Sequence, residues 1–152
     1  MRSARLFVTF FYLGYSKIAP GSIASLVTTL IFYLFAKYLF FSLLIIIILV
    51  TTILSFIAVG VYTSGSSEKD KSEIVIDEVI GQSIALSPLL LFPEYNLPEF
   101  YMCLISLLFF RFFDIVKPFP INEVDKINSN FGVILDDILA GFFSAIFLTL
   151  IL

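Results

Sequence analysis

The chain contains no histidine, no tryptophan and only one cysteine among its 152 residues. Without histidine it cannot build a histidine-ligated zinc site, a Ser–His or Cys–His catalytic pair, or a phosphohistidine intermediate. The single Cys103 excludes an internal disulfide bond and any metal site made of several thiolates. A phosphatase loop of the Cys-x5-Arg type would need arginine at position 109, which is Phe109. If the chain is a phosphatase, a metal-bound water molecule or an aspartate must therefore carry out the attack.

Charged side chains are also scarce. They make up 14% of the chain, against about 25% in an average soluble domain, whereas hydrophobic residues make up 60%. A soluble fold of this length could not bury so much apolar surface, so the composition predicts an integral membrane protein. The chain has no basic run, and this argues against a nucleic-acid partner.

The apolar residues fall into five runs, which predict an all-α membrane bundle of about five apolar helices in one domain, residues 1–152. Residues 39–62 carry no charge and would form a helix of about 36 Å, long enough to cross a hydrocarbon core of roughly 30 Å. Pro88 is expected to kink or end one of the other four runs. These four shorter runs are residues 22–36, 79–92, 97–113 and 138–152.

The distribution of basic residues predicts the orientation of such a bundle. With five spans and the N-terminus in the cytoplasm, eight of the nine lysines and arginines fall on the cytoplasmic side, and only Lys37 falls outside. Lys69 and Lys71, in the polar stretch 63–73, belong to the cytoplasmic group. This arrangement places the C-terminus outside.

Three of the apolar runs have carboxylates at their predicted cytoplasmic ends, where we expect them to cluster. Like charges repel one another strongly in a medium of low dielectric constant, and a divalent cation would relieve this repulsion. Oxygen ligands in a chain without histidine favour a hard ion, first of all Mg²⁺. The alternative is that the acids only cap helix N-termini, where the helix dipole favours them. The five residues are Asp77, Glu78, Asp114, Asp136 and Asp137.

Two glycines follow these acids at helical spacing. Gly81 lies four residues after Asp77, and Gly141 lies four residues after Asp137, so each glycine shares a helix face with its aspartate. Glycine one turn into a helix lets a neighbouring backbone approach closely. The pattern predicts close packing of the two acidic helices, although small residues also serve ordinary membrane packing.

Two basic residues and the start of a helix are further candidates for this site. Arg111 and Lys117 flank Asp114 and could hold a phosphate and stabilise its transfer, although basic residues at an interface also simply extend toward water. In "APGSIASL", Ser22 follows a Pro-Gly turn and is predicted to be the N-cap of a helix. The free N–H groups of that helix end could bind phosphate.

Four segments together resemble the phosphatidylglycerophosphatase A family. They read "APGSIASL", "EIVIDEVIG", "FRFFDIVKPFPI" and "GVILDDILAG", in the order typical of the family and over most of the chain. Two departures are "INSNFG" before the last segment, where members often have a His-Gly-Gly-like stretch, and Gln82, where they often have an aromatic residue.

The resemblance implies an all-helical enzyme of the bacterial inner membrane with helices packed around a central one. It implies Mg²⁺-dependent removal of the terminal phosphate from the lipid substrate phosphatidylglycerophosphate, giving phosphatidylglycerol. It also gives functional weight to six residues, which are Asp77, Glu78, Asp114, Lys117, Asp136 and Asp137.

We therefore predict a membrane enzyme whose active site faces the cytoplasm. Asp114 would be a further ligand or a base, and Lys117, Arg111 and Ser22 would bind the substrate phosphate. The alternative is a small ion-coupled transporter or channel subunit, whose carboxylates would bind the carried cation near the membrane midplane. A membrane scaffold without chemistry is a third possibility. The predicted Mg²⁺ ligands are Asp77, Glu78, Asp136 and Asp137.

Overall fold

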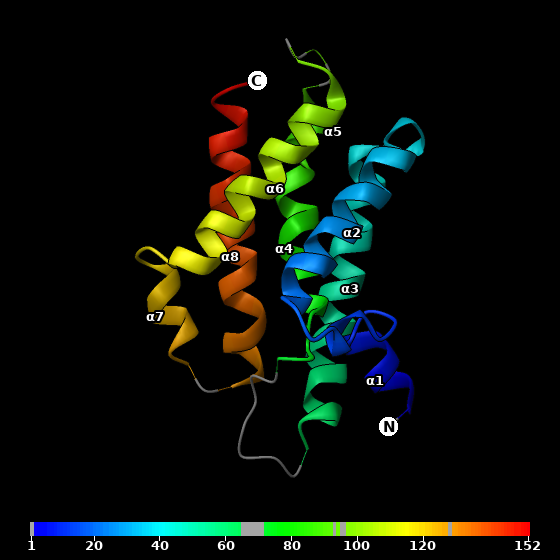
Figure 1. Cartoon of the computed structure of the whole chain (residues 1–152), viewed down its shortest axis with the longest axis vertical. Coiled ribbons are helices and arrows are strands. Elements are labelled where there is room, and N and C mark those ends of the chain that lie inside the picture. Colours follow the sequence, from blue (N-terminus) through cyan, green and yellow to red (C-terminus); the bar gives the residue numbers. More distant parts are fainter. Residues whose placement is uncertain (1, 65–71, 93, 95–96, 128) are drawn as a thin grey trace.

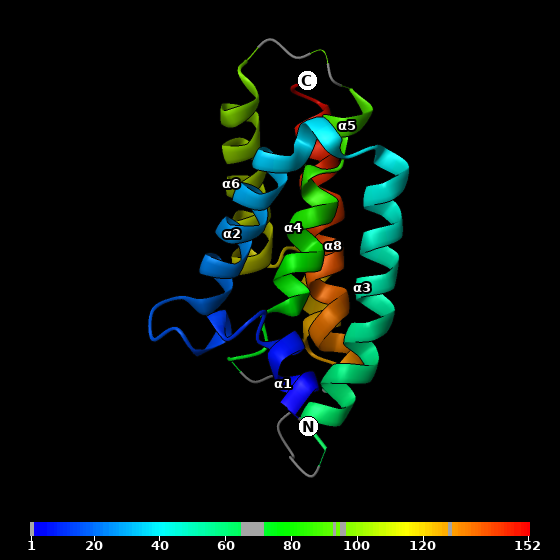
Figure 2. The same ribbon diagram turned by 90° about the vertical axis from the view of Figure 1, so that its right-hand side faces the viewer.

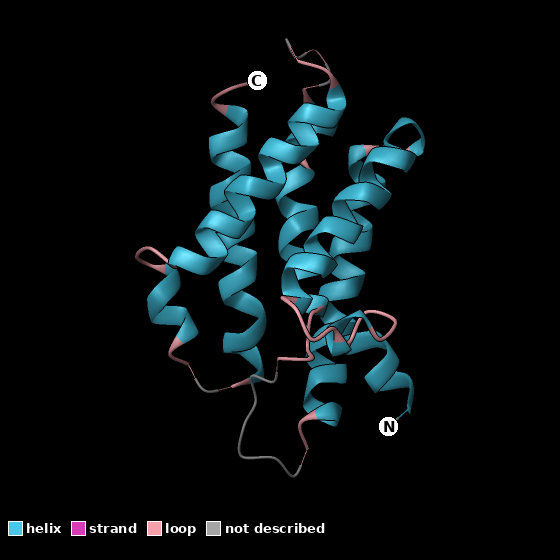
Figure 3. Cartoon of the chain, in the orientation of Figure 1, coloured by secondary structure: helices cyan, strands magenta, loops and turns pink. Residues whose placement is uncertain are grey.

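The computed structural model describes residues 2–64, 72–92, 94, 97–127 and 129–152. Within these ranges every regular element is helical, which confirms the all-α prediction (Figure 3). Lys69 and Lys71, which entered the charge count, lie outside the described residues. The α-helices are α1 (Arg2–Val8), α2 (Pro20–Phe35), α3 (Phe41–Tyr62), α4 (Ile76–Leu86), α5 (Pro88–Leu91), α6 (Glu99–Val116), α7 (Ile121–Asp125) and α8 (Asn130–Thr149).

Helix α4 lies at the centre of the bundle and packs against α2, α3, α6 and α8, most extensively against α8 (Figures 1 and 2). Its apolar side chains Ile76, Ile80 and Ile84 are buried in the main hydrophobic core. Helix α3, by contrast, buries only a narrow stripe of residues and exposes most of its apolar side chains. An exposed apolar surface of this kind is what a lipid-facing helix requires.

In the part of the chain that the structure describes, three helical stretches are long and apolar enough to cross a membrane: Pro20–Tyr38, Phe41–Tyr62 and Asn130–Thr149. The run 79–92 is divided into α4 and α5 at Pro88, as predicted, because proline cannot continue the helical hydrogen bonding. Helix α6 carries charges at both ends. A bundle of several apolar helices is therefore present, but five membrane crossings are not confirmed.

Two helix boundaries differ from the prediction and change the position of key residues. Helix α8 begins at Asn130 and not near residue 138, because the Ser129 hydroxyl caps it by accepting a hydrogen bond from the Gly132 N–H at 3.2 Å. Asp136 and Asp137 therefore lie about two turns inside α8 instead of before it. Likewise, Asp114 lies within α6, not after it.

The predicted N-cap of the first long helix was wrong. Helix α2 begins at Pro20, and its N-cap is Ala19 in the left-handed conformation, so Ser22 is the third residue of the helix. Proline at the first helical position has a φ angle already suited to the helix and lacks the N–H that would need a partner there. The Pro-Gly pair therefore starts the helix and is not a turn before it.

Candidate active site

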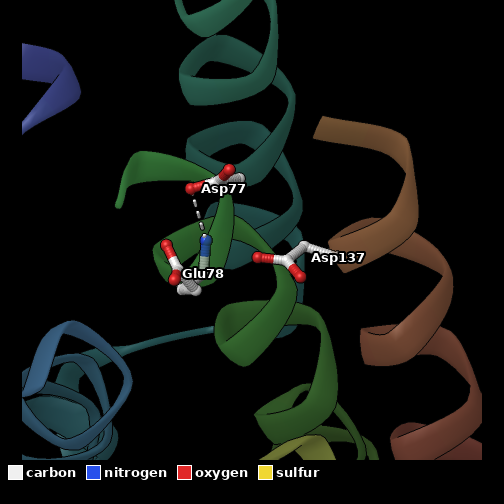
Figure 4. A group of neighbouring side chains, drawn as sticks. All are labelled: Asp77, Glu78 and Asp137. Carbon is white, nitrogen blue, oxygen red and sulfur yellow. Dashed lines mark hydrogen bonds between the residues drawn. The ribbon is translucent and has the colours of Figure 1, made fainter. Parts of the chain in front are cut away.

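Three carboxylates from two helices lie close together in the fold. Asp77 and Glu78 lie in the first turn of α4, and Asp137 lies on the facing side of α8 (Figure 4). One oxygen atom of each lies within 4.8 Å of the others. Asp77 and Asp137 are buried, and the Asp77 Oδ1 atom accepts a hydrogen bond from the Glu78 backbone N–H at 3.1 Å. We call these three residues the acidic triad.

Close contact between the helix backbones makes the acidic triad possible. A methyl group added to Gly81 would lie only 2.6 Å from the Asp137 carbonyl oxygen, and one added to Gly141 would collide with the Gly81 carbonyl. Each glycine is one helical turn from its aspartate, so the contact lies directly beside the acids. The prediction that these glycines permit close packing is confirmed.

A polar cavity of about 490 Å³ adjoins the acidic triad. Its wall is formed by the start of α2, the first turn of α4, the end of α6, α7 and the first turns of α8. Pro20 and Gly21 line it, but Ser22 is not among the lining residues. The predicted residues that do line it are Asp77, Glu78, Arg111, Asp114, Lys117, Asp136 and Asp137.

Lys117 also lines this cavity and is bound by two carboxylates. It ends α6 in a left-handed conformation with φ of 45°. Its Nζ atom donates a hydrogen bond of 2.7 Å to the Asp136 Oδ2 atom and another to Asp125. Burial alone would lower the pKa of Lys117, but the hydrogen bonds and charges of Asp125 and Asp136 raise it above its ordinary value. The ammonium group is therefore charged at neutral pH.

Asp136 consequently has a different environment from Asp137. Its Oδ2 atom faces Lys117, and it is not part of the acidic triad. Its other oxygen, Oδ1, is buried without a hydrogen-bond partner. Neighbouring residues on a helix point about 100° apart, and here Asp136 and Asp137 face different partners.

Arg111 and Asp114 form an ion pair within α6. The distance from Arg111 Nη1 to Asp114 Oδ2 is 2.5 Å, and the two residues are three positions apart on the helix. Both line the cavity, so the pair places one further positive and one further negative charge there. Asp114 is thus bound to an arginine and, like Asp136, does not belong to the acidic triad.

Two residues of the site were missed by the sequence analysis. A methyl group on Gly21 would overlap the Glu78 carboxylate, so this glycine leaves the room that Glu78 occupies beside the start of α2. The sequence signal for Gly21 is its place in the "APGS" segment, which by itself predicts only a turn. Asp125, the second partner of Lys117, lies on the short helix α7, and no sequence pattern singled it out.

Membrane-length helices around a cavity of carboxylates, lysine and arginine define an integral membrane protein whose polar site suits a phosphate ester. The family model described as phosphatidylglycerophosphatase A matches residues 6–152 of the chain. The chain belongs to this family, and the resemblance seen in the sequence is confirmed. It is a lipid phosphatase, and this decides for an enzyme over an ion transporter or a scaffold.

Similar proteins include two phosphatidylglycerophosphatases A and one candidate phosphatase of another lipid. The chain is 32% identical over 137 residues to a candidate phosphatidylinositol-3-phosphatase of Bacteroides thetaiotaomicron, covering 88% of this chain and 83% of the relative. It is 30% identical to the phosphatidylglycerophosphatase A of Haemophilus influenzae, covering 84% and 76% of the two chains. The same identity holds for phosphatidylglycerophosphatase A of Escherichia coli, with 87% and 73% covered. No solved structure was found to match the chain.

Proposed function

We propose that this chain hydrolyses the terminal phosphate monoester of phosphatidylglycerophosphate, in a reaction that depends on Mg²⁺, at the cytoplasmic face of a bacterial inner membrane. The observation that carries the proposal is that the acidic triad, Lys117 and Arg111 line one cavity. Carboxylates that gather a cation, next to basic groups that bind phosphate, are the combination that phosphate-ester hydrolysis needs.

The residues present fit a magnesium ion. The acidic triad offers only oxygen atoms, which this hard cation prefers, and these atoms lie close enough together to share one ion. The Glu78 Oε2 atom is buried without a hydrogen-bond partner, and a buried carboxylate oxygen without one is unfavourable. We therefore assign the cation to Asp77, Glu78 and Asp137, with Asp114 as a candidate for a further ligand or a general base.

The other residues would bind and orient the substrate. Bound Mg²⁺ would supply Lewis acidity, which withdraws charge from phosphate oxygens and makes a nearby water molecule more acidic. The Lys117 ammonium group, fixed by Asp136 and Asp125, would bind a phosphate oxygen and neutralise the charge that develops during transfer. Arg111, paired with Asp114 at the same cavity, would add a second positive charge.

Two arguments support this orientation of the site. The excess of lysine and arginine on one side of the predicted bundle favours the cytoplasm for that side. Asp77 and Glu78 lie in the first turn of α4, and the cavity that they line also includes Pro20 and Gly21 at the start of α2, a helix of membrane-spanning length. A lipid headgroup would present its phosphate at such a depth, whereas the hydrocarbon midplane would exclude it.

Phosphate release from purified protein in detergent tests the proposal. We expect release from phosphatidylglycerophosphate with Mg²⁺, none after chelation of the metal, and a severe loss in Asp137→Asn. The name of the Bacteroides relative makes phosphatidylinositol 3-phosphate the matched second substrate. Faster release from that lipid would overturn the proposed substrate but keep the lipid phosphatase. Release unaffected by chelation would overturn the role of the metal.

A further inference from the structure

The connection between α1 and α2 carries large apolar side chains that the rest of the described chain leaves uncovered. Phe11 is 71% exposed, Tyr12 54% and Ile18 78%. Many residues of α2 and α3 are also exposed, but they lie on helices of membrane-spanning length, so the hydrocarbon core explains them. Phe11, Tyr12 and Ile18 precede the first such helix and need another explanation.

The backbone of this connection is strained at its aromatic residues. Phe10, Phe11 and Tyr12 have φ angles of 42°, 56° and 70°, in the left-handed region that glycine and asparagine adopt most easily. Three consecutive bulky residues in this conformation are unfavourable unless the surrounding structure holds them. Aromatic side chains at positions where glycine would fit better indicate that the side chains themselves are needed there.

Thr9 and Gly14 hold the connection in this conformation. Thr9 is fully buried, and its hydroxyl donates to the Arg5 carbonyl at 2.8 Å and accepts from the Tyr12 N–H at 3.1 Å. The Gly14 N–H donates to the Thr9 carbonyl at 3.0 Å. Gly14 also lies so close to the Glu73 carbonyl that a methyl group would collide with it. The exposed aromatic side chains are thus presented by a fixed scaffold.

The position of the connection places it at the membrane boundary, beside the active site. It leads into Pro20 and Gly21, which line the polar cavity and begin a helix of spanning length. In Figure 2 this segment projects sideways from the bundle at the start of α2. Lys17 is exposed on it, next to Ile18. Aromatic residues and lysine together are typical of the headgroup region of a bilayer, where anionic lipids attract the lysine.

We propose that residues 10–18 form an interfacial anchor, which inserts Phe11, Tyr12 and Ile18 into the boundary between headgroups and acyl chains. The anchor sets the depth of the cavity relative to the phosphate plane of the bilayer. It does not depend on which lipid the enzyme hydrolyses.

The absence of tryptophan from the chain permits a direct test. Tyr12→Trp introduces a single fluorophore in a conservative aromatic exchange, and Ile18→Trp does so outside the three left-handed residues. Each variant is reconstituted in phosphatidylcholine–phosphatidylglycerol bilayers with lipids brominated either near the headgroup or near the chain end. Ile53→Trp, at an exposed position in the middle of α3, is the matched control for deep insertion.

We expect blue-shifted emission from the Tyr12→Trp and Ile18→Trp variants, with stronger quenching by bromine near the headgroup than near the chain end, and the reverse order for Ile53→Trp. Water-like emission quenched by aqueous acrylamide would overturn the anchor. Blue-shifted emission that neither brominated lipid quenches would also overturn it, because a second protein molecule would then cover the segment.

A second measurement connects the anchor to catalysis. The double variant Phe11→Ser/Tyr12→Ser should lose phosphate release from long-chain substrate in bilayers but keep release from a short-chain analogue dissolved below its micelle concentration. An equal loss on both substrates would contradict a role at the interface. If the wild type hydrolyses neither substrate, the proposed function fails, and the fluorescence result still decides the anchor.

Discussion

The two acidic pairs of the chain look equivalent in sequence but differ in the fold. In "IDEVIG" both acids, Asp77 and Glu78, join the acidic triad at the start of α4. In "LDDILAG" only Asp137 joins it, and Asp136 is paired with Lys117. Adjacent residues on a helix point about 100° apart, so two neighbouring acids do not normally reach the same site. In α4 both acids reach it, because the side chain of Glu78 is longer and Gly21 leaves space for it.

This comparison divides the site into one half that we propose binds the cation and another that we propose binds the phosphate. The first contains the acidic triad, and the second contains Lys117 with Asp136 and Asp125. Substitutions in the two halves should therefore have different effects on metal affinity and on turnover.

The largest effect is expected from Asp137→Asn, which removes one charge from the acidic triad. We expect phosphate release to fall roughly a thousandfold, because the cation that we propose for this site would lose a ligand. Binding of Mn²⁺, followed by electron paramagnetic resonance, should weaken in parallel. Glu99→Gln is the control, because it removes a carboxylate at the start of α6, the end opposite Arg111 and Asp114. It should leave both measurements unchanged. Unaltered Mn²⁺ binding in Asp137→Asn would remove this residue from the cation site.

Asp136→Asn should have a smaller effect of a different kind. Turnover should fall roughly 10- to 100-fold because Lys117 loses its buried partner, as is usual when a supporting residue is removed. The Mg²⁺ concentration for half-maximal activity should stay the same, because the acidic triad is intact. The double variant Lys117→Met/Asp136→Asn should be no slower than Lys117→Met alone, since the two residues act as a pair. If Asp136→Asn shifts the Mg²⁺ requirement as Asp137→Asn does, Asp136 is a metal ligand, as the sequence predicted.

The contact that brings both acidic helices together can be tested through stability. Gly141→Ala places a methyl group against the Gly81 carbonyl and should lower the free energy of unfolding by about 1–3 kcal/mol. Thermal unfolding in detergent would measure this as a lower midpoint. Gly60→Ala is the matched control, because the added methyl group would meet only the Asn130 side-chain amide at 3.1 Å, which can shift. Equal midpoints for the two variants would mean that the α4–α8 contact relaxes easily.

The smallest effect is expected from Asp125→Asn, which removes the other partner of Lys117. The Asp125 side chain is 43% exposed, against 9% for Asp136, and exposed ion pairs contribute only about 0–1 kcal/mol. Turnover should therefore stay within about fivefold of the wild type, a difference that steady-state kinetics resolves. A loss as large as that of Asp136→Asn would show that both carboxylates fix the lysine equally.

Much of the site could be predicted from the sequence, because its chemistry is concentrated in short segments. Acids at the ends of apolar runs, with a glycine one turn further on, indicated which helices would meet, and Gly81 and Gly141 do meet. The helix boundaries were harder to predict. Hydropathy alone placed the start of the last helix near residue 138, whereas the Ser129 cap starts α8 at Asn130. Polar residues are tolerated in its first turns because they face the cavity and not lipid.

The sequence by itself determined the class of the protein, because its apolar content requires a membrane and its lack of histidine leaves carboxylates as the ligands of the proposed metal ion. Only the tertiary structure decided which carboxylates face one another and which pairs with Lys117. The physical reason is that the direction of a side chain depends on the rotation of its helix against its neighbours. Packing at Gly81 and Gly141 sets that rotation, and distant parts of the chain supply the partners.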